Sequence, residues 1–250
     1  MKISIITVCY NSEATIEHTL KSVFSQDHSD IEYIVVDGGS TDDTLKIIEN
    51  YADRITVFIS EKDQGIYFAL NKGIQLATGE IIGILHSDDF FSNSSILSLL
   101  NTTFEQSGAE AVYGDLQYVH KDNVEKVYRN WVSGPYTEGL FLKGWMPPHP
   151  SFFAKRTCYQ RYGLFNTRFR SAADYELMLR FIEKHHIAVT YLPKVLVKMR
   201  VGGKSNVSLL NRLRANLEDR LAWKVNGIRP GWFTLTLKPL SKLRQFLGQR

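Results

Sequence analysis

The stretch Ile81-Ile82-Gly83-Ile84-Leu85-His86-Ser87-Asp88-Asp89 decides the fold of this 250-residue chain. It opens with a continuous apolar run, which is typical of a strand buried on both faces of a parallel sheet. It ends in two adjacent carboxylates, and burying such charges is costly unless a cation meets them. The stretch therefore predicts a buried strand that delivers an acidic pair to one edge of a sheet.

Short apolar runs alternate with helical patterns along the first 115 residues. This alternation predicts βαβ units and a mostly parallel, Rossmann-like α/β sheet flanked by helices. We expect strands at 3–8, 31–36, 55–59, 81–85 and 111–113, and helices at 12–24, 41–51, 65–77 and 94–104. Beyond them, 116–170 is less regular, 172–184 is helical, 189–197 is strand-like, 200–205 is a turn or mobile loop, and 206–225 is an amphipathic helix.

Polar side chains follow each of the first four predicted strands, at Tyr10-Asn11, Asp37-Gly38, Ser60 to Asp63 and His86 to Asp89. Because ligands bind outside the carboxyl ends of parallel strands, these four ends predict one ligand site. An adjacent carboxylate pair suits Mg²⁺ or Mn²⁺ that also carries phosphate oxygens. The alternative for Asp88-Asp89 is a helix N-cap, but Ser92 or Asn93 would fill that role more naturally.

Other candidate residues keep two readings when only their spacing is considered. Asp63 precedes a helix, so it is either an N-cap or a contact for the nucleotide. Asp174 lies at the start of another helix, so it is either an N-cap or a general base. Lys72 either reaches a phosphate or lies on a solvated helix face. His149 lies between prolines in the stiff segment 143–150, where it orients a phosphate or an acceptor, or only packs.

Charge is distributed unevenly along the chain, whose formal net charge is +4. Residues 198–250 hold 12 Lys or Arg against two acidic residues, whereas the remainder is mildly acidic. A basic amphipathic arm predicts binding to an anionic surface, either membrane headgroups or nucleic acid, and packing on its own domain or on a second copy in a homodimer is the alternative. Two cysteines and no leader or membrane-spanning run predict a cytoplasmic protein.

Five motifs together resemble the inverting glycosyltransferases of family 2, which have the GT-A fold. They are Ser4 to Asn11, Asp37 to Thr44, Gly65 to Gly73, Ala77 to Glu80, and Ser87 to Asp89. Their order and spacing are specific and cover roughly residues 1–115. The later matches, His149-Pro150 and Ala173-Asp174-Tyr175, are shorter, and Ala173 stands where many relatives carry Glu.

The resemblance implies a nucleotide-sugar donor, most often a UDP-sugar, and a divalent cation, Mg²⁺ or Mn²⁺. It makes Asp89 the metal ligand and Asp174 the catalytic base. The donor would contact Thr7, Tyr10, Asn11, Asp37, Gly38, Asp63, Lys72, Ser87 and Asp88, with Arg200 and Lys204 closing over its pyrophosphate. Weaker candidates for acceptor or phosphate contact are Trp145 and His149.

The chain divides by this reading into a GT-A domain at 1–204 and a basic C-terminal helical extension at 205–250. Within the domain, 1–115 would bind the nucleotide-sugar and 116–204 the acceptor. The Gln-x-x-Arg-Trp motif of processive synthases is absent, which favours transfer of single sugars, and the body of the chain resembles enzymes that build bacterial surface polysaccharides on lipid carriers. We therefore expect a lipid-linked acceptor and a peripheral position on the inner face of the membrane. The alternatives are a metal-dependent sugar nucleotidyltransferase and a non-catalytic nucleic-acid-binding protein.

Overall fold

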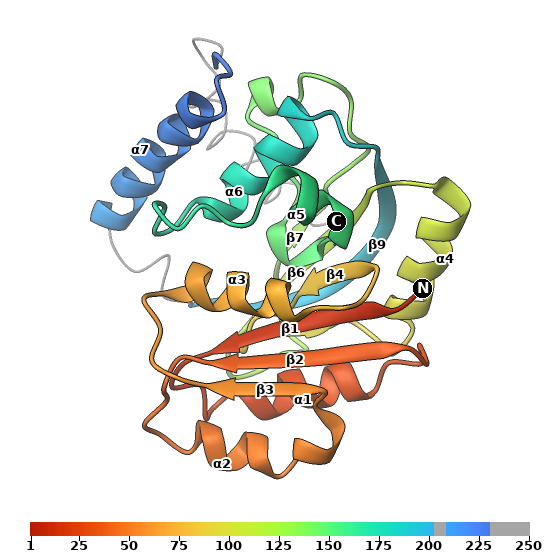
Figure 1. Cartoon of the computed structure of the whole chain (residues 1–250), viewed down its shortest axis with the longest axis vertical. Coiled ribbons are helices and arrows are strands. Elements are labelled where there is room, and N and C mark those ends of the chain that lie inside the picture. The colour runs from red at the N-terminus through yellow and green to blue at the C-terminus, as the bar shows by residue number, and fades with distance from the viewer. Residues whose placement is uncertain (203–208, 231–250) are drawn as a thin grey trace.

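The computed structural model of the chain describes residues 1–202 and 209–230 (Figure 1). A mixed nine-stranded sheet runs through it in the order β3-β2-β1-β4-β8-β6-β9-β5, with β7 paired to β6. The strands are β1 (Ile3–Cys9), β2 (Ile31–Asp37), β3 (Val57–Ser60), β4 (Ile81–Ile84), β5 (Asp89–Phe91), β6 (Ala111–Val119), β7 (Val127–Trp131), β8 (Phe152–Lys155) and β9 (Val189–Arg200).

Helices flank this sheet and connect most of its strands. The α-helices are α1 (Ile16–Phe24), α2 (Thr44–Glu49), α3 (Ile66–Leu76), α4 (Ile96–Ser107), α5 (Arg156–Tyr162), α6 (Ala173–Met178) and α7 (Leu209–Val225). Short 3₁₀ turns are η1 (Ala52–Arg54), η2 (Phe141–Lys143) and η3 (His149–Ser151), and a π-helical turn, η4 (Leu179–Lys184), continues α6.

The first half of the chain is the parallel βαβ arrangement that the sequence predicts. β1 pairs in parallel with β2 on one side and β4 on the other, and β2 pairs in parallel with β3. Helix α3 packs on β1 and β2, and it approaches closely because Gly73 has no side chain. A Cβ atom at Gly73 would lie 2.5 Å from Cγ2 of Ile6. All residues of β1 are buried, which explains its continuous apolar sequence.

The second half contains structure that the sequence did not predict. The segment 116–170, expected to be irregular, holds β7, β8 and α5, and β6 continues to Val119. Strand β8 pairs antiparallel with β4 and β6, so it joins the two halves of the sheet. Strand β7 is exposed or half-buried except at Trp131, so it lacks the apolar run that marks the parallel strands. The expectation that Arg200 begins a turn is wrong, because this residue pairs with Val119 as the last residue of β9.

Helix α7 packs against α6 (Figure 1). Its Ala222 and Trp223 side chains are fully buried in the hydrophobic core. The helix expected at 206–225 is present over Leu209–Val225. Of the predicted basic extension at 205–250, residues 205–208 and 231–250 lie outside the described residues, so the extension as a whole stays a prediction. Within residues 1–202 and 209–230, every helix is too short or too polar to cross a bilayer.

A buried carboxylate fastens the start of β1 and β2 to the turn before β4. Glu32 is 3% exposed and accepts hydrogen bonds from Ser4 Oγ at 2.5 Å, Thr78 N at 2.7 Å, Thr78 Oγ1 at 2.6 Å and Lys2 Nζ at 3.1 Å. Burial by itself would raise the pKa of Glu32, but these bonds outweigh it and lower the pKa to about 2. The ionised carboxylate therefore stabilises the folded state.

We predict that Glu32→Gln destabilises the protein at pH 7 by about 2–3 kcal/mol, because the depressed pKa is worth about 1.4 kcal/mol per unit. The native pKa of Glu32 lies below its unfolded value, so this contribution is present above about pH 4.5 and is lost as pH falls toward 2. Urea unfolding at pH 7, 5 and 3.5 should show the gap between wild type and variant closing with acid. The exposed Glu49→Gln is the matched control, and a gap that does not depend on pH would contradict the assignment.

Candidate active site

The polar ends of β1, β2, β3 and β4 lie at one edge of the sheet, as their parallel pairing requires. Cys9 pairs with Asp37, and Asp37 pairs with Ser60, so these strands end level with one another. Ser12 Oγ, after β1, lies 2.9 Å from Ser87 Oγ, after β4. The segments that the sequence placed around one ligand site are therefore neighbours in space.

Asp37 shapes the loop that follows β2. The side chain is fully buried, and its Oδ2 accepts hydrogen bonds from Gly39 N and Ser40 N, both at 2.9 Å, and from Ser60 Oγ at 2.8 Å. Its Oδ1 accepts from Ser40 Oγ at 2.5 Å. Both oxygens thus serve the loop itself, and the expected contact of Asp37 with a nucleotide remains a prediction.

Asn11 and Asp63 form the sides of this loop. Asn11 has a positive φ of 49°, and its Oδ1 accepts a hydrogen bond from Thr41 N at 2.9 Å. Asp63 Oδ1 accepts from Gly65 N at 2.8 Å, just before α3. A Cβ atom at Gly38 would lie 2.8 Å from Asp63 Oδ2, so a larger residue there would displace the Asp63 side chain. The Tyr10 ring beside them is 49% exposed.

Three other expected donor contacts are placed less directly. Thr7 is fully buried, and its hydroxyl lies 3.0 Å from Tyr33 Oη, while Lys72 forms an ion pair with Glu61. Each of the two thus has a protein partner. Lys204 lies outside the described residues.

Asp89 is a buried carboxylate of a different kind. It is fully buried as the first residue of β5, and among the described residues neither Oδ1 nor Oδ2 has a hydrogen-bond partner. Burial and, second, the neighbouring Asp88 raise its pKa well above the usual range, and the opposing effect of Arg200 is smaller. An orphaned carboxylate fits a cation ligand, because an unpaired buried charge is costly. No group of three or more His, Cys, Asp or Glu in the described part of the chain could hold a metal, so a bound ligand would have to complete the shell.

Arg200 fixes the backbone of the acidic pair from β9. Its Nη1 donates a hydrogen bond to the carbonyl oxygen of Asp88 at 2.6 Å, and its Nη2 contacts His18 Nδ1 on α1. The guanidinium carbon lies 5.0 Å from the centre of the Phe90 ring. At 8% exposure Arg200 is a buried support for the loop before β5, and its expected closure over a pyrophosphate remains a prediction.

Asp174 faces a histidine and a tyrosine from two other elements. Its Oδ2 lies 3.1 Å from Nδ1 of His149, in η3, and its Oδ1 accepts a hydrogen bond from Tyr67 Oη, on α3, at 3.4 Å. Asp174 is 21% exposed and His149 is 32% exposed, so the pair is half-buried yet open to a small molecule. The structure therefore brings together two residues that the sequence singled out separately, and it adds Tyr67, which had been missed.

His86 lies between the Asp174 pair and the acidic pair. The ring centres of His86 and His149 are 5.6 Å apart, and His86 Nδ1 is buried with no hydrogen-bond partner among the described residues. Burial and, second, the charge of His149 lower the pKa of His86 to about 4, against the opposite influence of Asp88 and Asp174. His86 is therefore a neutral imidazole at neutral pH.

Arg129, which packs on Tyr118, brings a cation to the face of the sheet on which Asp89 lies. Asp89 pairs with Met199, and Met199 pairs with Tyr118, so these side chains point to one side. Arg129 pairs with Tyr118 across β6 and β7, with its guanidinium carbon 4.2 Å from the tyrosine ring centre. Sequence reasoning missed both because it ended this strand at 113 and placed no strand at β7.

Trp145 has a packing environment in the structure. Its indole Nε1 donates to the carbonyl oxygen of Ser133 at 2.8 Å. Its ring lies against the rings of Tyr113, Tyr136 and Phe141, with centres 5.4–5.6 Å away. These contacts account for the residue as part of an aromatic cluster, and its expected contact with an acceptor is untested.

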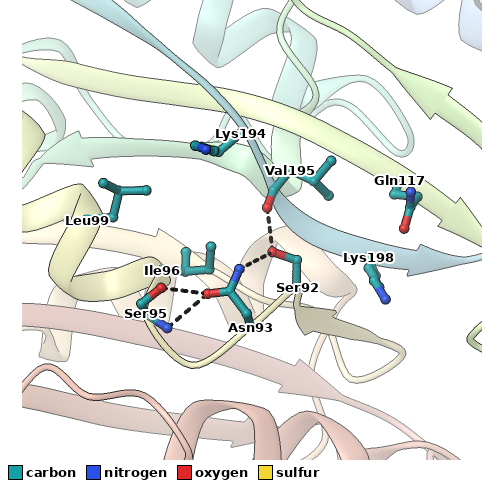
Figure 2. Close-up of a pocket in the computed structure, with 9 residues that line it drawn as sticks. All are labelled: Ser92, Asn93, Ser95, Ile96, Leu99, Gln117, Lys194, Val195 and Lys198. Atoms are coloured by element: carbon teal, nitrogen blue, oxygen red, sulfur yellow. Dashed lines mark hydrogen bonds between the residues drawn. The ribbon is translucent and has the colours of Figure 1, made fainter.

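A cavity of about 420 Å³ lies elsewhere, between the start of α4 and β9 (Figure 2). Its wall includes Gln117 and Lys198, which pair with each other and so point to the face opposite Tyr118 and Met199. None of the predicted site residues lines it. The candidate active site is therefore the open strand-end edge and the half-buried cluster around Asp174, and this cavity is separate from it.

Comparison with known sequences gives a consistent family. A model of glycosyl transferase family 2 matches residues 4–163. The chain is 29% identical over 208 residues to a PGL/p-HBAD biosynthesis glycosyltransferase of Mycobacterium tuberculosis, covering 81% of this chain and 78% of that protein. It is 31% identical over 184 residues to the chondroitin synthase of Escherichia coli, covering 72% of this chain and 26% of the synthase.

Solved structures share the fold. TarS 1-349 of S. aureus, in complex with UDP-GlcNAc, superposes with a TM-score of 0.72 at 19% identity, over 90% of this chain and 65% of that one. This chain therefore spans slightly less than two thirds of the TarS fragment. The mannosyltransferase PcManGT from Pyrobaculum calidifontis, in complex with GDP-Man and Mn²⁺, superposes with a TM-score of 0.66 at 18% identity, over 100% of this chain and 76% of that one.

The matched region extends from β1 through α5 and so contains every strand end that builds the donor-side edge. The sequence-based expectation of a GT-A sheet agrees with the fold of these neighbours. The chain belongs to glycosyl transferase family 2 and is a glycosyltransferase.

Proposed function

We propose that this enzyme transfers one sugar, with inversion, from a nucleotide-sugar to a hydroxyl of a lipid-linked glycan in the synthesis of a bacterial surface polysaccharide. The observation that carries the proposal is the Asp174–His149–Tyr67 cluster. The His149 ring centre lies 5.6 Å from that of His86, which precedes the Asp88-Asp89 pair in the chain. A candidate base and a candidate leaving-group site then belong to one region of the molecule. A single displacement, which inverts the anomeric carbon, uses one group to remove the acceptor proton and another to stabilise the charge on the leaving group.

A nucleotide-sugar donor is supported by the strand-end edge. The loop held by Asp37 meets the end of β1, where Asn11 N donates a hydrogen bond to Ser40 Oγ at 2.8 Å. Tyr10, beside Asn11, is 49% exposed and offers an aromatic surface to a nucleoside base. The TarS neighbour holds UDP-GlcNAc and the PcManGT neighbour holds GDP-Man, so both uridine and guanosine donors occur on this fold. We favour a UDP-sugar.

The transfer step follows from the position of Asp174. The acceptor oxygen attacks the anomeric carbon and the bond from that carbon to the diphosphate oxygen breaks, so a nucleoside diphosphate leaves with its electron pair. Asp174 takes the hydroxyl proton. His149 contacts Oδ2 through Nδ1 and Tyr67 donates to Oδ1, so the carboxylate is held in one orientation while it acts.

A divalent cation, Mg²⁺ or Mn²⁺, fits the orphaned carboxylate of Asp89. Bound there, it would supply positive charge that stabilises the leaving diphosphate. The chain's own contribution is to hold the loop, which Arg200 does through the Asp88 carbonyl oxygen. The Mn²⁺ in the PcManGT neighbour supports this reading.

We also propose that α7 rests on an anionic membrane surface at the inner face, where a lipid-linked acceptor would be found. Leu217, Leu221 and Val225 recur every four residues along one side of the helix and are 64%, 39% and 41% exposed. Arg220 and Lys224 are exposed beside them. An exposed face that mixes apolar and cationic side chains suits an interfacial helix.

Substitutions of Asp174 and of His149 should separate proton removal from the orientation of the carboxylate. We predict that Asp174→Asn reduces kcat by at least about 1000-fold, since general base catalysis is worth about 10²–10⁴-fold, with the UDP dissociation constant unchanged. His149→Ala should cost about 10–100-fold in kcat, whereas His149→Asn, which keeps an N–H donor near Oδ2, should retain most activity. The assay is release of UDP from a panel of UDP-sugars with lipid extract as acceptor.

Two results would count against these roles. Transfer by Asp174→Asn near the wild-type rate removes Asp174 as base. Equal loss in His149→Asn and His149→Ala would mean that His149 itself exchanges the proton rather than orienting the carboxylate.

Substitution of Asp89 tests the proposed cation site by a binding measurement that does not depend on an activity assay. We predict that MnCl₂ with UDP raises the melting temperature of wild type, because a ligand at 100 times its dissociation constant stabilises by about 2.7 kcal/mol. This gain should vanish in Asp89→Asn, while the smaller effect of UDP alone is kept. Asp43→Asn, at an exposed acid before α2, is the matched control. An undiminished Mn²⁺ effect in Asp89→Asn would place the cation elsewhere.

Charge reversal on α7 tests the membrane contact. We predict that Arg220→Glu with Lys224→Glu weakens binding to vesicles containing phosphatidylglycerol by at least about tenfold, since each basic residue near an anionic surface is worth about 1 kcal/mol. Co-sedimentation of the full chain measures this. Arg161→Glu with Lys184→Glu changes two exposed cations outside α7 by the same charge. If both double variants lost vesicle binding equally, binding would depend on net charge alone and not on α7.

A further inference from the structure

We propose that α7 belongs to the active site, with Glu218 acting as a positioning residue for Asp174. The proposal rests on the assignment of Asp174 as base. It concerns the backbone that carries this side chain. A segment that the sequence marked as a C-terminal extension would then be required for transfer by the domain before it.

The start of α6 has no capping side chain of its own. The residue before the helix is Ala172, which makes no side-chain cap hydrogen bond, and α6 spans only Ala173–Met178. The first N–H groups of a helix need acceptors, and so do those of a turn that leads into one. Asp174 is the second residue of this uncapped helix, so its position depends on what holds the turn.

Glu218 supplies the acceptors from α7. Its Oε1 accepts a hydrogen bond from Arg170 N at 3.0 Å, and its Oε2 accepts from Ser171 N and Ala172 N, both at 2.9 Å. Ser171 Oγ also donates to Oε2, at 3.0 Å. One carboxylate therefore gathers three consecutive backbone N–H groups, and charged acceptors make the stronger hydrogen bonds. We call this arrangement the Glu218 clamp.

Two further contacts hold α7 to α6 on the other side of Asp174. Trp223 is fully buried, and its Nε1 donates to Tyr175 Oη at 2.9 Å. Asn226 Nδ2 donates to Glu176 Oε1 at 3.0 Å. Glu218 thus holds the backbone before Asp174, while Trp223 and Asn226 hold the side chains of the two residues that follow it, so the segment is supported on both sides.

The side chain of Asp174 meets different partners from its backbone. His149 and Tyr67 contact the carboxylate, and Tyr67 Oη also accepts a hydrogen bond from Ala173 N at 3.3 Å. The carboxylate can meet these partners only if the turn at 170–172 stays in place. Because misplacement of a reacting group by about 1 Å can cost about 100-fold in rate, release of the Glu218 clamp should lower kcat.

The test compares Glu218→Ala, Glu218→Gln and Glu32→Gln in the full chain. The readouts are melting temperature, the UDP dissociation constant, and the Asp174-dependent release of nucleoside diphosphate from UDP-GlcNAc and from GDP-mannose. We expect Glu218→Ala to lower kcat by about 10–100-fold, with KM for the donor and the UDP dissociation constant within about twofold of wild type. Glu218→Gln keeps one acceptor oxygen and should lie between Glu218→Ala and wild type.

Glu32→Gln is the control for lost stability, because Glu32 is a buried hydrogen-bonded carboxylate remote from α6 and α7 in the sheet. It should lower the melting temperature and leave kcat unchanged below that temperature. A kcat for Glu218→Ala equal to wild type overturns the proposal. So does a loss in kcat that Glu32→Gln reproduces at the same melting temperature, because the effect is then one of stability.

Amide hydrogen exchange tests the Glu218 clamp without catalysis. In wild type, the amides of 170–172 should be protected, and in Glu218→Ala they should exchange at least about tenfold faster while those of β2 stay unchanged. Unaltered exchange at 170–172 overturns the Glu218 clamp itself. If wild type shows no Asp174-dependent release, the proposed function fails, and the exchange result still decides whether the Glu218 clamp exists.

Discussion

The pairing of the short strand β5 with the end of β9 is the constraint on which the site depends. Asp89 pairs with Met199, so a residue that closes the first, parallel half of the chain is fixed to a strand of the second half. Arg200, next along β9, donates to the Asp88 carbonyl oxygen and anchors the loop between β4 and β5. Strand β9 also runs beside β6, which brings Tyr118 and Arg129 to the same face. The acidic pair is thereby attached to the second half of the chain.

Three carboxylates of the site are distinguished by their surroundings. Asp37 accepts hydrogen bonds at both oxygens from its own loop, which gives it a structural role whatever else it binds. Asp89 is equally buried and has no partner among the described residues, so its charge is tolerated only with a cation or a proton. Asp174 is half-buried and meets His149 and Tyr67, which orient it and leave it accessible. The same functional group thus occurs in three environments, of which the first holds a loop and the other two fit the proposed cation site and the proposed base.

The sequence predicts one side of this site better than the other. Parallel strands buried on both faces appear as apolar runs, so the sequence alone places their ends, from Asp37 to Asp89, at one edge of the sheet. Strand β7 has no such run, and it was missed together with Arg129. The contact of His149 with Asp174 joins η3 to the start of α6 across 25 positions, and no local pattern indicates it. Family membership supports a glycosyltransferase rather than a non-catalytic protein, whereas the roles of the individual residues remain predictions.

Helix α7 connects two requirements that usually fall on separate elements. Its inner side binds the turn before α6 through Glu218 and the Tyr175 side chain of α6 through Trp223, and Asn226, just after α7, binds Glu176. Its outer side presents Leu217 and Leu221 beside exposed cations. A helix of this length is rigid along its axis, so a surface that fixes the outer side also limits how far the inner side can move. The acidic residues of α7 are the ones that turn inward or are buried, which leaves the outer side without negative charge to oppose an anionic lipid. A membrane contact on α7 would therefore act on the same helix that positions the base, and it would do so without any change in the sheet that holds the donor.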